Sequence, residues 1–155
     1  MMKVFMLIMA VMLELSAVSQ NEVTGKWYTV TQTTNNGTYT TEKEYLYLNA
    51  DRTFSIVVLV SLQKKEAFVK DLRIEVSGIW KVWNNIIVAV VKKVNVPSAK
   101  EVYLISQESL SNLSKTFKRK FQNEPIRIHT IHHIDKNSLI TVNEKAKKTS
   151  YKRQK

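Results

Sequence analysis

The feature that most constrains the fold is a series of short apolar segments that alternate with polar residues and are separated by turn residues. In residues 68–76, Leu72, Ile74 and Val76 fall on one face and charged residues on the other, the pattern of a half-buried strand. Asn35-Asn36-Gly37 and Asn84-Asn85 are typical of hairpin turns, because Asn and Gly tolerate positive φ. The other strand-like segments are 26–34, 42–49, 53–62, 78–83, 86–94, 101–106, 126–134 and 139–144. Short turns between so many strands indicate an antiparallel meander, which removes its edges by closing into a barrel.

Residues 107–121 depart from this pattern. Leu110, Leu113, Phe117 and Phe121 fall on one stripe at helical spacing, and Pro125 follows, so we expect an amphipathic helix. Segments 54–62 and 86–91 are apolar on both faces, whereas a barrel wall needs only one apolar face. The helix, or a dimer interface, is expected to cover their outer faces. The predicted fold is all-β: an antiparallel up-and-down β-barrel of about eight or nine strands with one amphipathic helix packed outside.

The N-terminal residues have the features of an export signal. Lys3 precedes an apolar run at residues 4–13, which is too short to span a bilayer, and Ala17-Val18-Ser19 supplies small residues for cleavage after Ser19. A buried N-terminal helix is the alternative. We therefore expect a signal peptide at 1–19, a barrel domain at 20–144 and a basic, flexible tail at 145–155, in a secreted or periplasmic protein.

The composition limits the chemistry of the chain. It has no cysteine, which excludes disulfides, thiolate catalysis and cysteine-based zinc sites. Its net charge is +11, with basic clusters near 115–120 and in the tail. A terminal basic run is either a solvated tail or a site for anionic lipid, polysaccharide or another polyanion, and export argues against genomic nucleic acid. The predicted polyanion-binding residues are Lys118, Arg119, Lys120, Lys147, Lys148, Lys152 and Arg153.

Side chains that could carry catalysis or bind a metal do not form a recognised motif. His129, His132 and His133 are clustered, but on a strand His132 opposes the other two, and His129 and His133 lie about 13 Å apart. The carboxylates of Glu42 and Glu44 flank Lys43 and are interpreted as solvated pairs. We therefore expect no enzymatic activity, no metal site and no cofactor.

Three segments carry a family resemblance: Gly25-Lys26-Trp27 on the first expected strand, the hairpin 45–54, and Ser77-Gly78-Ile79-Trp80. With them the chain resembles the lipocalin (calycin) group, in particular its small secreted bacterial members. The resemblance implies a barrel that holds a small apolar ligand, and a late basic residue that packs over the first-strand Trp. Arg127 is the candidate for that residue, although it follows the helical segment instead of preceding it, and the family disulfide is absent.

The sequence thus predicts a lipocalin-like binding or transport protein for a small hydrophobic or amphipathic ligand, fatty-acid- or lipid-like, that acts as a monomer or homodimer. The alternative is a cationic protein that binds anionic surfaces through the basic helix end and tail. Gly25, Trp27 and Arg127 are expected to close the barrel base. The residues predicted to face the ligand are Leu46, Tyr47, Leu48, Leu72, Ile74, Val76, Val88, Val90 and Leu104.

Overall fold

The computed structural model describes residues 17–155, so the apolar run at 4–13 lies outside the described residues. The elements are α1 (Gln20–Val23), β1 (Gly25–Asn35), β2 (Thr38–Leu48), β3 (Thr53–Lys64), β4 (Ala67–Trp83), β5 (Ile86–Asn95), β6 (Glu101–Tyr103), α2 (Gln107–Asn123), β7 (Ile126–Ile134), β8 (Ser138–Asn143) and β9 (Lys148–Gln154). Neither helix of this described part is long and apolar enough to cross a membrane.

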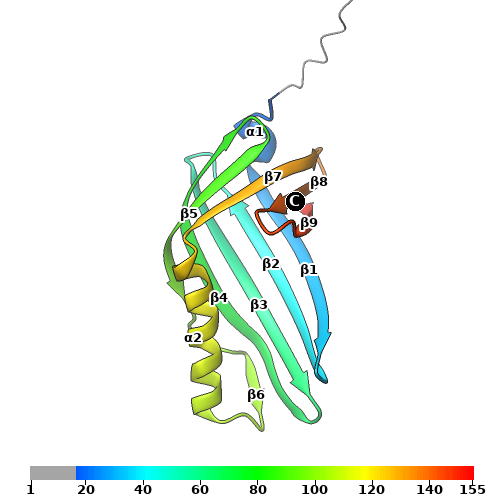
Figure 1. Cartoon of the computed structure of the whole chain (residues 1–155), viewed down its shortest axis with the longest axis vertical. Coiled ribbons are helices and arrows are strands. Elements are labelled where there is room, and N and C mark those ends of the chain that lie inside the picture. The colour runs from blue at the N-terminus through cyan, green and yellow to red at the C-terminus, as the bar shows by residue number, and fades with distance from the viewer. Residues whose placement is uncertain (1–16) are drawn as a thin grey trace, which may run out of the picture.

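The strands form a closed antiparallel barrel (Figure 1). The order β3-β2-β1-β9-β8-β7-β5-β4 is completed by pairing of β3 with β4, which gives eight barrel strands, and the short β6 adds to the other edge of β4. The helix α2 lies outside the ring of strands. The predicted fold class is therefore confirmed.

The C-terminal residues form a barrel strand, so the expected flexible tail at 145–155 is wrong for most of its length. β9 pairs with β8 from Lys148 to Lys152 and with β1 from Lys152 to Gln154. Tyr151 from β9 is buried in the core. The barrel therefore extends to residue 154, and without β9 the ring of strands would be open between β1 and β8.

Bulky apolar residues close one end of the barrel beneath α1. Val23 and Trp27 are completely buried there, and the indole Nε1 of Trp27 donates a hydrogen bond to the Val23 carbonyl over 2.8 Å. Ser19 caps α1 by accepting a hydrogen bond from the Glu22 amide, while the Glu22 carboxylate accepts one from the Ser19 amide. Val18 donates to the carbonyl of Asn84, which ties this end to the β4–β5 turn.

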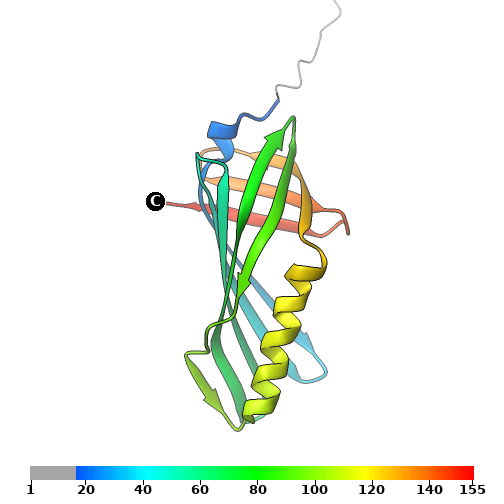
Figure 2. The same ribbon diagram turned by 90° about the vertical axis from the view of Figure 1, so that its left-hand side faces the viewer.

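The opposite end of the barrel is splayed. β1 and β9 pair only through residues 26–28 and 152–154, and β5 and β7 only through residues 86–90 and 126–130. Along the rest of their length β1–β4 form a curved sheet, and α2 lies beside its lower half (Figure 2). The apolar stripe of α2, with Leu110, Leu113, Phe117 and Phe121, packs against the core from this open side.

The position of α2 corrects one expectation. The helix was expected to cover the outer faces of segments 54–62 and 86–91, but Phe117 and Phe121 instead line the interior together with inward residues of β3 and β5. The reason is the gap that the short β5–β7 pairing leaves in the wall, because an apolar helix face there buries more surface than it would on the outer side. The outer face of β5 is consequently left without a helix over it.

Candidate functional site: a cavity inside the barrel

The interior of the barrel contains a cavity of about 630 Å³. Its apolar part is lined by inward residues of five strands: Leu46, Leu48, Phe54, Ile74, Ile87 and Leu139. Its polar part comprises Glu42, Glu44, Arg127, His129, Thr141 and Tyr151. Side chains at the mouth come from the last turn of α2 and the β8–β9 turn: Phe117, Lys120, Phe121, Glu124, Lys145 and Lys147. The volume lies within the range of about 300–1,000 Å³ that small-molecule sites occupy.

The cavity lining changes from apolar to charged along its length, as the inward residues of β2 show. Leu48 pairs with Gly25 next to the closed end, whereas Glu44 and Glu42 lie progressively further from it, opposite Thr29 and Thr31. All inward β2 side chains share one parity, so the strand presents leucines toward the closed end and carboxylates toward the mouth. The site is therefore apolar at its closed end and charged at its open end.

A hydrogen bond between β2 and β9 stands at the boundary of the two parts. The Tyr151 hydroxyl donates to Oε1 of Glu44 over 2.8 Å. Burial raises the pKa of Glu44, and this effect exceeds the opposing effect of the Tyr151 hydrogen bond. Burial and the Glu44 charge together raise the pKa of Tyr151 well above its ordinary value. The interpretation of Glu44 as one of a solvated pair is wrong, since its side chain points into the cavity.

Arg127 of β7 brings a cation to the same region. Its guanidinium lies over the Phe121 ring, 4.4 Å from the ring centre, and Nη2 donates to the Lys120 carbonyl over 3.2 Å. Its Nε is fully buried and has no hydrogen-bond partner among residues 17–155. Burial lowers the pKa of Arg127, while Glu124 and Glu44 act in the opposite direction. A guanidinium that lines a cavity can donate from its Nη atoms to an acceptor atom of a ligand.

The mouth is bridged by an ion pair. Lys145 of the β8–β9 turn lies 3.2 Å from the carboxylate of Glu124, which follows α2. Both side chains are largely exposed, at 76% and 58% respectively, so the pair contributes little stability and can separate. A ligand could therefore pass between α2 and the β8–β9 turn without disrupting the core.

The predicted ligand-facing residues divide into three groups. Leu46, Leu48 and Ile74 line the cavity, and Leu72 and Val76 are buried in the core outside its lining. Tyr47, Val88 and Val90 point outward, because their neighbours along each strand line the cavity. Leu104 follows β6 and is 64% exposed. The inward orientation expected for these last four residues is wrong, and whether the others contact a ligand stays a prediction.

The barrel base contains Gly25 and Trp27 as expected, but its arginine is Arg153 and not Arg127. The Arg153 guanidinium lies 4.1 Å from the centre of the Trp27 ring and donates to the carbonyls of Thr24 and Glu22 over 2.8 and 2.7 Å. Gly25 has a φ of +143°, which L side chains rarely adopt, and a Cβ atom there would also displace this guanidinium, so the position favours glycine. β7 pairs with β5, whereas β9 pairs with β1. Arg153 of β9 therefore lies beside Trp27, and Arg127 of β7 lies at the cavity.

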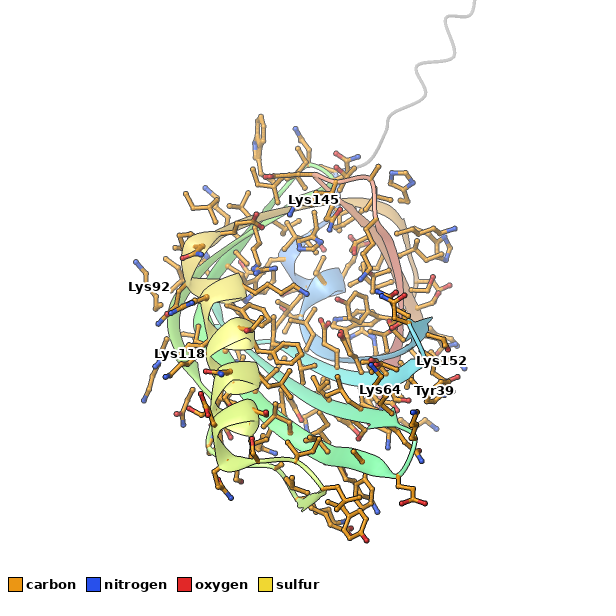
Figure 3. All side chains as sticks on the ribbon, turned by 60° about the horizontal axis from the view of Figure 1, so that its bottom comes forward. Tyr39, Lys64, Lys92, Lys118, Lys145 and Lys152 are labelled. Atoms are coloured by element: carbon orange, nitrogen blue, oxygen red, sulfur yellow. The ribbon has the colours of Figure 1, made fainter. Side chains whose placement is uncertain are left out.

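The predicted polyanion-binding residues do not form one surface. Lys120 and Lys147 line the cavity mouth, and Arg153 packs on Trp27. Lys118 and Arg119 are exposed on α2, whereas Lys148 and Lys152 are exposed on β9. Figure 3 shows Lys118 and Lys152 on opposite sides of the molecule. These cations offer no continuous patch, and whether any of them binds a polyanion stays a prediction.

The three histidines are separated by a bulge in β7. Ile131 pairs with Thr141 but His133 pairs with Ile140, so His132 is the extra residue and the faces exchange beyond it. His129 therefore lines the cavity, where burial and Arg127 lower its pKa, while His133 contacts Asp135 on the outside. Within residues 17–155, no cluster of three or more potential metal ligands is present.

A comparison with known protein families finds none that this chain matches, and no curated protein matches it significantly.

Proposed function

We propose that the protein is an exported carrier that binds one small amphipathic molecule, fatty-acid- or lipid-like, in the barrel cavity. The observation that carries this proposal is the polarity of the cavity, which is apolar at the closed end and is lined by the Arg127 guanidinium toward the mouth. A hydrocarbon chain among Leu46, Leu48 and Phe54 would gain about 0.8 kcal/mol for each CH₂ group buried. The export signal expected at residues 1–19 supports a role outside the cytoplasm.

The polar end of the ligand is placed by Arg127. A carboxylate or another acceptor beside Arg127 takes a hydrogen bond from a guanidinium Nη and is attracted by the guanidinium charge. Glu44 and Tyr151 stand close by, and burial raises the pKa of Glu44, so that it keeps its proton to a higher pH than an exposed glutamate.

Titration of the purified protein with a fatty acid and with the corresponding fatty alcohol tests this proposal. Arg127→Gln is expected to weaken binding of the acid by about ten- to a hundredfold, the loss of one charge-assisted hydrogen bond, and to affect the alcohol much less. Arg73→Gln on the outer face of β4 is the matched control, since Arg73 is exposed and bonded to Glu75. Equal losses for acid and alcohol would contradict the placement of the head group.

A cavity-filling pair tests the site itself. Ala89 lines the cavity, whereas Ala67 begins β4 and lies outside the lining, so Ala89→Phe should abolish binding and Ala67→Phe should leave it intact. If Ala89→Phe binds the acid as tightly as the unsubstituted protein, the ligand does not occupy the barrel.

A further inference from the structure

The outer face of β4, β5 and β7 carries a large apolar patch without a cover. Cross-strand pairing aligns Ile79 with Val90 and Val90 with Ile126 in one row, and places Val88 beside Ile128 in the next. Trp83 ends the patch at the β4–β5 turn. The exposed fractions are 67% for Trp83, 58% for Ile126, 49% for Ile79 and 37% for Ile128. Apolar residues that adjoin across three strands mark an interaction surface, unlike single exposed ones.

Among residues 17–155, no helix covers this patch. Figure 2 shows that α2 lies beside the lower part of the molecule and leaves the upper part of the β4–β5 hairpin uncovered. Because Phe117 and Phe121 of α2 face the cavity, the helix has no apolar surface left for the outside of the barrel. On β4 and β5 the patch residues have the opposite parity to the cavity residues, whereas on β7 Ile126 and Ile128 also adjoin the edge of the cavity.

The charges around the patch distinguish its candidate partners. Lys81 lies within it, between Ile79 and Trp83 on the outward side of β4, and Lys93 follows in the next outward row of β5 opposite Ser77. Beyond β7 the row continues from Thr130 to Val142 of β8 and then to Lys148 of β9, so a lysine also lies beyond that edge of the patch. The whole protein carries a net charge of +11, which opposes self-association. Apolar and aromatic residues surrounded by lysines match an anionic lipid surface.

The N-terminal end of the described chain emerges at the same place. The Val18 amide donates to the Asn84 carbonyl, so the chain joins the barrel at the turn that follows Trp83. The apolar run at residues 4–13 precedes this point by only a few residues.

We propose that the outer face of β4, β5 and β7 docks the barrel onto anionic lipid membranes, with Trp83 and Ile126 inserted at the interface and Lys81 among the head groups. Ile126 and the preceding Pro125 both line the cavity. Docking through Ile126 would therefore hold the cavity mouth near the lipid. The docking proposal does not rest on ligand binding in the barrel, so absence of vesicle binding would leave the proposed function standing.

Vesicle flotation tests the docking surface. The protein, purified after export, is mixed with vesicles of phosphatidylcholine alone or with phosphatidylglycerol added. Binding is expected only to the anionic vesicles, and Trp83→Ser/Ile126→Ser should lower the partition coefficient about tenfold or more. Lys81→Gln should lower it about fivefold. The control is Val30→Ser/Tyr39→Ser, which alters two other exposed apolar residues (44% and 45%) on β1 and β2, outside the patch, and should change little.

A second readout is independent of variant folding. Trp27 and Trp80 are buried, so Trp83 alone among the three tryptophans should be quenched by brominated lipid. Equal vesicle binding by both double variants would overturn the proposal. So would a dimer in sedimentation velocity that Trp83→Ser/Ile126→Ser dissociates while no vesicle binding occurs, because the patch would then bind a second copy.

Discussion

Arg153 offers the most direct test of how the barrel is closed. Its guanidinium donates hydrogen bonds of 2.8 and 2.7 Å to the carbonyls of Thr24 and Glu22 and stacks on the fully buried Trp27. Two hydrogen bonds from a charged donor contribute about 1.5 kcal/mol each at the lower end of their range. The cation–π contact adds about 1 kcal/mol at a partly exposed site. Arg153→Ala should therefore lower the free energy of unfolding by about 3–4 kcal/mol.

The assay is urea unfolding followed by tryptophan fluorescence and by circular dichroism, with the slope m compared between variants. Lys152→Ala is the control, because Lys152 is exposed on the same strand and should change stability by no more than about 0.5 kcal/mol. Arg153→Lys keeps the charge but cannot donate to both carbonyls in the same fork, so it should recover only a part of the loss. If Arg153→Ala costs no more than Lys152→Ala, Arg153 does not fasten α1 and Trp27 to β9, and our account of the closed end is wrong.

Three further perturbations test other parts of the structure. A chain that ends at Lys147 lacks β9 and should fail to fold, as judged by circular dichroism; a stable, cooperatively unfolding product would contradict the role of β9 as the strand between β1 and β8. Because burial raises the pKa of Glu44, the folded state holds this proton more tightly than the unfolded state, and stability should fall as pH rises from about 4.5 through the raised pKa. Glu44→Gln should remove that fall, whereas Glu66→Gln should keep it; parallel stability profiles for Glu44→Gln and the unsubstituted protein would count against a buried Glu44. Gly78→Ala places a Cβ atom against the Val90 carbonyl and the Phe54 ring and should cost about 1–3 kcal/mol in urea unfolding, while an unchanged midpoint would show that β4 and β5 separate easily there.

The sequence was sufficient to predict the barrel because its signals are local. Asn36 and Gly37 both adopt positive φ in the β1–β2 turn, as an Asn-Gly hairpin requires. Leu72, Ile74 and Val76 are buried as their alternation indicates. Amphipathic spacing likewise located α2. Such features depend on neighbours within a few residues, which a sequence displays directly.

The errors concern features that only pairing decides. In β5 both faces are apolar, so the pattern could not tell whether Val88 or Ile87 points inward, and the register with β4 and β7 selects Ile87. In β9 a single large apolar residue, Tyr151, stands among basic and small polar residues, which resembles a solvated tail. A signal was nevertheless present for Glu44, because it has the same strand parity as Leu46 and Leu48, which were expected to face inward.

The central claim is that the cavity holds a small amphipathic molecule, and native mass spectrometry of the protein purified after export from a bacterial host tests it most directly. Our account predicts a non-covalent adduct of lipid-like mass that organic extraction removes, that returns on incubation with a fatty acid, and that Ala89→Phe prevents. The denatured mass of the same sample gives the N-terminus and is expected to correspond to cleavage after Ser19. A clean protein mass that persists after incubation with a series of fatty acids would contradict the account.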